Sequence, residues 1–282
     1  DGLFANREDP IIVPVWQDKN LVSSEEFPKA VFLQGRDSKP CLEKATQLVF
    51  LGSEGDTNYL AADLSHLTSF ENLGLPKNTN FEDLRQLATS LDPTEAGYLA
   101  YARALTHWNR NSIYCGKCAS PTKSIRSGHE RVCTNTDCAK VHFPRTDSAV
   151  IMLVIHPDKK QCLLGCNKRF KGLRYSTLAG FVEPGETFEH AVVREVKEET
   201  NIDVENIIYQ ASQPWPFPAS LMVGFTAQAT STEIICSDEE LLEAKWFSYK
   251  ETEDLAKKGD MLPPENYSIS RWLIDQWLLN SR

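Results

Sequence analysis

Three glutamates within five consecutive residues could bind metal ions. Glu195, Glu198 and Glu199 stand at positions i, i+3 and i+4, so in a helix their carboxylates share one face. Carboxylates this close raise one another's pKa unless cations lie among them. Oxygen ligands with high negative charge suit hard cations such as Mg²⁺ or Mn²⁺, which also bridge phosphate oxygens. An ordinary solvated acidic helix face is the alternative, and for these three residues in isolation it is the favoured interpretation.

Four cysteines form a second candidate metal site. Cys115, Cys118, Cys133 and Cys138 have the form C-x2-C, fourteen residues, then C-x4-C. Two short loops that each present a pair of thiolates can close a tetrahedral site without an open position, so we predict one structural Zn²⁺. No secretory signal opens the chain, which favours metal ligands over disulfides. Four buried free cysteines are the alternative interpretation, and His142 is a further candidate ligand.

A helix must carry the three glutamates, and strands must surround that helix. Residues 187–200 are predicted to form the helix, and an apolar segment at 178–182 precedes it. Because helices and strands follow one another without strict alternation, we predict an α/β (α+β) region with a mixed sheet. Strands are predicted at residues 148–156, 161–166, 202–211, 221–230 and 246–249, and a closing amphipathic helix at 269–279.

The first 90 residues are predicted to be rich in β-structure. Strand–turn–strand patterns are predicted at residues 11–22 and 47–64, with turns at 17–20 and 52–58. A helix then runs from Pro93 to about residue 109, with Asp92 as a good N-cap and Glu95 completing a capping box. This part of the chain contains no recognisable catalytic group.

The composition is that of an ordinary globular protein. Of the 282 residues, 41% are hydrophobic and 24% are charged, which excludes wholesale disorder and collagen-like repeats. The longest apolar run is residues 149–155, far short of the roughly 20 residues that a membrane span needs. A net charge of −9 argues against a long nucleic-acid footprint but not against one nucleotide held through metal ions. We therefore predict a soluble protein with no membrane partner.

The ends of the chain and its thiolates bear on where the protein resides. The chain starts at Asp1 rather than at Met, so we expect a fragment or a processed form of a longer protein. Reliance on thiolate ligands indicates a reducing interior, the cytoplasm or the peroxisome. The final Ser281-Arg282 does not form the S-K-L peroxisomal address.

The acidic segment is part of a longer pattern that runs from Gly180 to Ile202. It resembles the Nudix box, G-x5-E-x7-R-E-U-x-E-E-x-G-U, in which U is a bulky aliphatic residue. An ion pair between Glu186 and Arg194 would tie the loop of the box to its helix. Asn201 stands where the family has glycine. Asn is the non-glycine residue that best tolerates a left-handed backbone at a helix end, so we expect a modest loss of stability and no lost chemistry.

A second motif narrows the resemblance to one group within the family. Residues 212–220, Ser-Gln-Pro-Trp-Pro-Phe-Pro-Ala-Ser, match the signature of the NADH pyrophosphatases. Three alternating prolines stiffen an extended backbone, so we predict a rigid rail that presents polar and aromatic side chains to rings and ribose hydroxyls. The alternative is a proline-rich surface loop. The resemblance covers residues 91–282 with specific motifs, and the N-terminal segment only loosely.

The resemblance implies a fold and a division into domains. We expect a Nudix fold with a mixed sheet between helices, preceded by a zinc ribbon and a β-rich N-terminal domain. The expected limits are 1–111 for the N-terminal domain with its final helix, 112–143 for the zinc ribbon and 144–282 for the Nudix hydrolase domain.

The resemblance also implies ligands for more than one catalytic Mg²⁺ or Mn²⁺ per subunit. Glu240 is chosen over Glu233, Glu239 and Glu243 because of its spacing to residues 244–247. The implied ligands are the carbonyl oxygen of Ala179 and the carboxylates of Glu195, Glu198, Glu199 and Glu240.

For the substrate, the resemblance implies a base held between two aromatic rings from different subunits of a homodimer. The matching positions are Phe143 and Phe181, although Phe143 could equally be a core residue. The remaining implied substrate-binding residues are Ala179, Gly180, Gln213, Pro214, Trp215, Pro216, Phe217, Pro218, Ala219, Ser220 and Ser270.

The implied reaction is hydrolysis of the pyrophosphate bond of NADH or NAD⁺ to nicotinamide mononucleotide and AMP, with removal of NAD caps from RNA. Glu199 or Glu198 takes the proton of the attacking water, and the sequence does not separate them. Because the chain is acidic, we expect the cap rather than the RNA body to supply most of the recognition. The alternatives are hydrolysis of another nucleoside diphosphate such as ADP-ribose, or a non-catalytic zinc protein that senses nucleotides.

Overall fold

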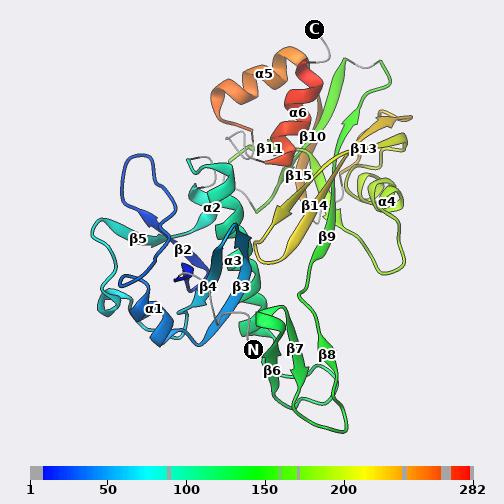
Figure 1. Ribbon diagram of the computed structural model, residues 1–282. Helices are drawn as coiled ribbons and strands as arrows, with labels where there is room; N and C mark the ends of the chain where they lie inside the picture. The colour runs from blue at the N-terminus through cyan, green and yellow to red at the C-terminus, as the bar shows by residue number, and fades with distance from the viewer. Residues whose placement is uncertain are drawn as a thin grey trace. The chain divides into compact units, whose positions relative to one another are not determined.

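The computed structural model forms two compact units, which are described separately (Figure 1). The first unit consists of Asp1–Arg145 with Pro216–Ala219, and the second of Thr146–Trp215 with Ser220–Arg282. The structure describes residues 9–87, 90–158, 160–169, 172–236, 240–261 and 268–279.

A five-stranded sheet in the order β3-β4-β1-β2-β5 forms the first unit. Strand β1 pairs in parallel with β4, and the other pairs are antiparallel. The predicted long turns are wrong, because both strand pairs continue through polar residues and leave two-residue turns at 17–18 and 55–56. The strands are β1 (Ile11–Trp16), β2 (Lys19–Ser23), β3 (Gln47–Glu54), β4 (Thr57–Asp63) and β5 (Thr79–Glu82).

Helices cover both faces of this sheet. The long helix α3 (Pro93–Asn111) packs Leu99, Ala102 and Leu105 on one core. Asp92 is the N-cap as predicted, because its carboxylate accepts hydrogen bonds from the backbone N–H groups of the first turn. The predicted capping box is wrong, because the Glu95 carboxylate accepts from the Ala30 N–H at 3.1 Å instead. The other face forms a second core with Cys41 of α1. The short helices are α1 (Lys39–Lys44), η2 (Glu71–Leu73) and α2 (Leu84–Leu87).

A small three-stranded sheet in the order β6-β7-β8 completes the first unit. Strand β6 follows the first pair of cysteines in the chain, β7 ends at Cys133 of the second pair, and β8 follows Cys138. Its elements are β6 (Thr122–Ile125), η3 (Arg126–Gly128), β7 (Glu130–Cys133) and β8 (Val141–His142).

The second unit is built on a seven-stranded mixed sheet. Its central strand β9 pairs in parallel with β14 and antiparallel with β10 and β12. Strand β13 pairs with β14, while β11 and β15 pair with β10. The strands are β9 (Asp147–Ile155), β10 (Gln161–Asn167), β11 (Tyr175–Ser176), β12 (Leu178–Phe181), β13 (Val204–Trp215), β14 (Ser220–Ala229) and β15 (Leu241–Ser248).

Alternate residues of β9 face two separate cores, one on each side of the sheet. Val150 and Met152 pack with helix α4 (Phe188–Thr200), whereas Ile151 and Leu153 pack with the residues of helix α6 (Ile269–Leu279). Helix α5 (Tyr249–Lys258) lies on the α6 side (Figure 1). The predicted mixed sheet between helices is confirmed. Among the described helices, none has the length and apolar character needed to cross a membrane.

Two predictions about the second unit are wrong in extent. The strand predicted at 202–211 continues through the first half of the proline-rich signature to Trp215. The short strand predicted at 246–249 begins at Leu241, because its polar residues alternate with core residues along the edge of β10. Helix α5 was not predicted, although Ser248 and Glu251 form a capping box at its start.

Candidate active site and zinc centre

Helix α4 begins and ends where the sequence predicts. The Thr187 hydroxyl accepts a hydrogen bond from the His190 N–H at 3.2 Å and caps the first turn. At the other end Asn201 adopts the left-handed conformation, with φ 60° and ψ 13°. Asparagine therefore fills the conformational role that glycine has in the box.

An ion pair fixes the loop before α4 to the helix. The Arg194 guanidinium donates to both carboxylate oxygens of Glu186, each at 2.8 Å, and to the carbonyl of Phe181 at 2.9 Å. These bonds from Arg194 hold the pKa of Glu186 at about 2. The predicted pairing of Glu186 with Arg194 is present, and the same guanidinium also pairs with Glu195 at 2.8 Å.

Glu199 is buried and Glu195 is partly buried, with its side chain 14% exposed. Glu199 is only 7% exposed, and its Oε2 has no hydrogen-bond partner among the described residues. Burial, together with the charges of Glu195 and Glu240, raises the pKa of Glu199 to about 8. Burial also raises the pKa of Glu195. The solvated acidic face is thus the wrong interpretation for Glu195 and Glu199, while Glu198 is exposed and accepts from Arg194 at 3.1 Å.

Glu240 belongs to the same acidic cluster. Its charge contributes to the raised pKa values of Glu195 and Glu199, so its carboxylate lies near theirs. Of the rival candidates, Glu243 accepts from Tyr175 and pairs with Lys245 at 2.6 Å. Glu233 is exposed, as is Glu240 itself, so exposure does not separate these two residues, and Glu239 lies outside the described residues.

Strand β12 passes directly beside the cluster. A Cβ placed on Gly180 would overlap the carboxylate of Glu195, so only glycine leaves room for that carboxylate. Ala179, one residue earlier, is exposed and pairs with Ile151 of β9. The strand thus runs along the acidic cluster at the two positions that the box resemblance assigned to metal and substrate.

The cluster fits divalent cations. Glu195, Glu199 and Glu240 supply only oxygen donors. Arg194 pairs with Glu195 at 2.8 Å, but among the described residues the buried Oε2 of Glu199 has no hydrogen-bond partner, and the repulsion from Glu195 and Glu240 acts on it. A divalent cation would relieve both the repulsion and the unpaired oxygen. Hard cations prefer such ligands.

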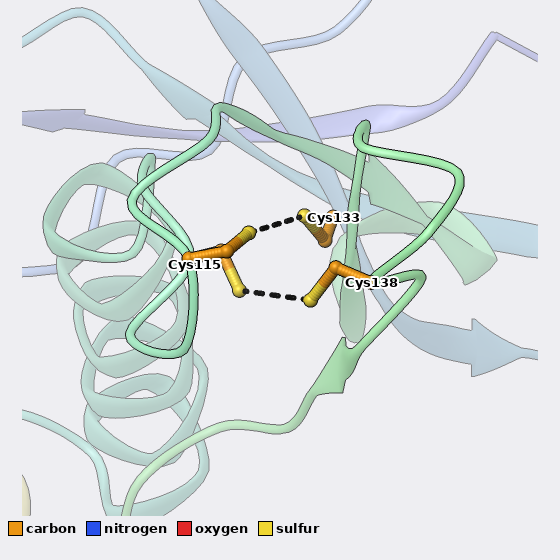
Figure 2. Close-up of side chains that lie close together, drawn as sticks. Cys115, Cys133 and Cys138 are labelled. Carbon is orange, nitrogen blue, oxygen red and sulfur yellow. Dashed lines mark hydrogen bonds between the residues drawn. The ribbon is translucent and has the colours of Figure 1, made fainter.

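The four cysteines converge as a zinc site requires. Their Sγ atoms all lie within 4.8 Å of one another, with 3.8 Å between Cys115 and Cys138 and 3.4 Å between Cys118 and Cys133 (Figure 2). Four sulfurs held tetrahedrally at about 2.3 Å from zinc are about 3.8 Å apart. The described residues place no histidine in this group, so four thiolates without His142 fit a structural zinc ion.

The thiols of this site differ in pKa before a cation binds. Hydrogen bonds from Ser120 lower the pKa of Cys118 to about 6, whereas burial raises the pKa of Cys133 to about 12. A buried thiol with such a pKa becomes a thiolate when a cation binds it. The alternative of four inert, buried cysteines is wrong for Cys118, which is exposed.

Three family models match consecutive parts of the chain. The NADH pyrophosphatase-like rudimentary NUDIX domain matches residues 10–108, the NADH pyrophosphatase zinc ribbon domain 110–143, and the NUDIX domain 145–273. The NAD-capped RNA hydrolase NudC of Pseudomonas aeruginosa is 38% identical over 237 residues, which are 83% of this chain and 80% of that protein. This chain belongs to the NADH pyrophosphatase group of the Nudix family.

Other relatives are similar over part of their length. The NAD-capped RNA hydrolase NUDT12 of Homo sapiens is 42% identical over 197 residues, which are 67% of this chain. The chain spans only 43% of that relative's length. A crystal structure of a NUDIX hydrolase from Nitrosomonas europaea has a TM-score of 0.47 at 18% identity and covers 59% of this chain and 90% of that one.

The signature of this Nudix hydrolase is a hairpin and not the predicted rigid rail. Pro214 and Trp215 end strand β13, where they pair with Leu221 and Ser220 of β14. Proline is tolerated there because β13 is an edge strand. The tip, Pro216–Ala219, is part of the first unit.

Two arginines that the sequence analysis missed hold this tip. The guanidinium groups of Arg85 and Arg103 lie 4.6 and 4.7 Å from the centroid of the Phe217 ring, close enough for cation–π attraction. Arg103 also donates to the carbonyl of Pro216. No local pattern marks these arginines, because their partners lie more than 100 positions away.

Two predicted substrate residues make hydrogen bonds inside the second unit. The side-chain oxygen of Gln213 accepts from the Ile269 N–H at 2.8 Å, at the start of α6. Ser270 is buried, and its hydroxyl accepts from the Thr177 hydroxyl at 2.8 Å. Gln213 therefore joins the start of α6 to strand β13, and Ser270 joins α6 to Thr177, which directly precedes β12.

The two predicted stacking rings are open to solvent. Phe143 is 65% exposed and Phe181 is 61% exposed. The core interpretation of Phe143 is therefore wrong. Exposed phenylalanine rings offer the apolar faces that stack on bases.

Proposed function

We propose that this Nudix hydrolase cleaves the pyrophosphate bond of NADH or NAD⁺ to nicotinamide mononucleotide and AMP, and removes NAD caps from RNA. The observation that carries the proposal is the cluster of Glu195, Glu199 and Glu240 beside Gly180, in which Glu199 is buried and Glu240 is exposed. Two relatives of the chain are named NAD-capped RNA hydrolases, and two of the three matched family models are named for NADH pyrophosphatases.

In this proposal each subunit binds more than one Mg²⁺ or Mn²⁺ ion, and the ligands come from α4, β12 and the segment before β15. Ions bound there would neutralise the negative charge of the pyrophosphate and lower the pKa of a bound water. The proposed ligands are Glu195, Glu198, Glu199, Glu240 and the carbonyl oxygen of Ala179.

Glu199 and Glu198 are the proposed bases, and their environments differ. Glu199 has a pKa of about 8, so it holds a proton at neutral pH until a cation displaces it. The Glu198 side chain is 60% exposed and pairs with Arg194 at 3.1 Å, so it is accessible to solvent. The attacking water gives its proton to whichever of the two carboxylates is not engaged as a ligand.

Substrate recognition in this proposal needs a homodimer. Phe181 of one subunit and Phe143 of the other stack on the two faces of a base, and the exposure of both rings supports this role. Sedimentation of the protein would give a dimer mass. The remaining proposed substrate-binding residues are Ala179, Gly180, Gln213, Pro214, Trp215, Pro216, Phe217, Pro218, Ala219, Ser220 and Ser270.

The proposal includes three domains and one structural zinc ion per subunit. We retain the limits 1–111, 112–143 and 144–282. Their internal boundaries lie within three residues of the ends of the zinc ribbon match and of the adjoining ends of the neighbouring matches. The four thiolates of the zinc site require reduced cysteines, which supports a reducing compartment such as the cytoplasm or the peroxisome.

The direct test is to incubate the zinc-loaded protein with NADH and Mg²⁺ and to identify the products. We expect equal amounts of AMP and reduced nicotinamide mononucleotide. Glu199→Gln should lose this turnover while it keeps its circular dichroism spectrum and zinc content. Absence of AMP from the wild type, or full turnover by the variant, would contradict the proposal.

A further inference from the structure

The connection between β10 and β11 concentrates positive charge in an acidic protein. Residues 168–174 contain Lys168, Arg169, Lys171 and Arg174 and no acidic residue, whereas the whole chain has 39 acidic and 30 basic residues. Lys171 lies outside the described residues. Arg169 and Arg174 are exposed, so this basic connection presents its described arginine side chains to solvent.

The first end of the basic connection contacts the acidic cluster. The Lys168 N–H donates to the carbonyl of Glu240 at 3.1 Å. Glu240 is the residue whose charge raises the pKa of Glu195 and Glu199. Arg169 is the next residue, so its backbone directly follows the hydrogen bond between Lys168 and Glu240.

The other end of the basic connection leads into strand β12. Arg174 precedes Gly180 by six residues, and Gly180 touches the Glu195 carboxylate. Tyr175, the residue after Arg174, pairs with Cys166 of β10, and the chain leaves β10 at Lys168, whose N–H donates to the Glu240 carbonyl. Arg169 and Arg174 therefore both lie at the end of β10 that is next to Glu240, one of the proposed metal ligands.

Charge explains why the basic connection would affect binding of a capped RNA and not binding of NAD⁺. Divalent cations in the acidic cluster can neutralise the pyrophosphate, but they do not reach phosphates further along a nucleotide chain. An attached RNA brings one negative charge per nucleotide towards four glutamates, and repulsion at this range is only partly screened at about 0.1 M salt. Positively charged side chains just outside the metal site would offset this repulsion.

We propose that Arg169 and Arg174 bind the phosphodiester backbone of an RNA attached to the cap, beyond the pyrophosphate that is cleaved. This inference rests on the proposed function and adds a site for the RNA body. The exposed side chain of Leu173, 53% exposed between the two arginines, offers an apolar contact for a ribose or a base. The cap still supplies most of the binding, in keeping with the net charge of −9.

The test compares two substrates that share the same scissile bond, NAD⁺ and an NAD-capped RNA of ten nucleotides. In the double variant R169Q/R174Q, the KM for capped RNA should rise at least about tenfold at 0.1 M salt. The slope of log KM against log salt should fall by about 1.4, since each phosphate contact with a single strand contributes about 0.7. The kcat and KM for NAD⁺ should stay within about twofold of the wild type.

The matched control is K257Q/K258Q, which removes the same charge from two exposed lysines at the end of α5. It should leave the KM of both substrates unchanged. An unaltered KM for capped RNA in R169Q/R174Q, or an equal rise for NAD⁺, would overturn the inference while the proposed function stands. A wild-type protein that cleaves neither substrate would instead overturn the proposed function, and this inference with it.

Discussion

The carboxylate of Glu195 lies against the α-carbon of Gly180, in the space that any larger residue would fill with its Cβ. Gly180→Ala must therefore displace either the strand or the carboxylate. Because small displacements of catalytic groups cost about a hundredfold in rate, we expect kcat for NADH to fall by about that factor. Steady-state kinetics and the melting temperature, which should change little, would check this.

The matched control for this substitution is Gly97→Ala in α3. A Cβ there meets no atom within 4 Å, and alanine in a helix interior is more stable than glycine by roughly 0.5–1 kcal/mol. This variant should keep full activity and gain slight stability. A Gly180→Ala protein as active as Gly97→Ala would show that the position of Glu195 does not matter for turnover.

The buried Glu199 predicts a pH dependence of stability in protein without Mg²⁺ or Mn²⁺ and with its zinc retained. Its pKa is about 8 in the folded protein, whereas a glutamate in the unfolded chain has its ordinary pKa of 4.5. Between these two pH values the folded state holds a proton that the unfolded state has released. Stability is therefore full below pH 4.5 and is lost as the pH rises towards 8. The slope is at most about 1.4 kcal/mol per pH unit.

Urea unfolding at several pH values between 5 and 8 measures this slope. Glu199→Gln cannot ionise, so its slope should be smaller than that of the wild type. A smaller slope should remain, because the pKa of Glu195 is also raised. Identical slopes in the two proteins would contradict a buried, protonated Glu199.

Elements set by local signals were predictable from the sequence. The caps Asp92 and Thr187 and the left-handed Asn201 act through backbone groups within a few residues, and helices α3 and α4 lie where the sequence predicts. The four cysteines were predictable for the same reason, because their spacing alone determines which thiolates two short loops can bring together.

Elements that depend on distant contacts were not predictable. Strand β13 extends through Pro214 because β14 pairs with it, and proline content alone favoured a stiff rail. Gln213 bonds to Ile269, 56 residues away. The burial of Glu199 likewise comes from the sheet beneath α4 and not from the helical spacing that first drew attention to it.

Asn201 predicts opposite effects for two substitutions. Its φ of 60° suits glycine, so Asn201→Gly should stabilise the protein by up to about 1 kcal/mol. Asn201→Val places a β-branched residue in the left-handed region and should destabilise it by about 1–2 kcal/mol. Urea unfolding measures both, and kcat for NADH should not change in Asn201→Gly. A large gain of activity in Asn201→Gly would mean that asparagine weakens catalysis here.

The zinc centre gives the last prediction. Cys118→Ser removes one of four sulfurs that lie within 4.8 Å of one another, and serine is a poor ligand for zinc compared with a thiolate. We expect the zinc content to fall from one ion per chain to well below one, with a lower melting temperature because metal binding and folding are coupled. Cys236→Ser, outside this group, should retain one zinc ion. Full zinc content in Cys118→Ser, measured by elemental mass spectrometry, would show that three cysteines and another ligand suffice.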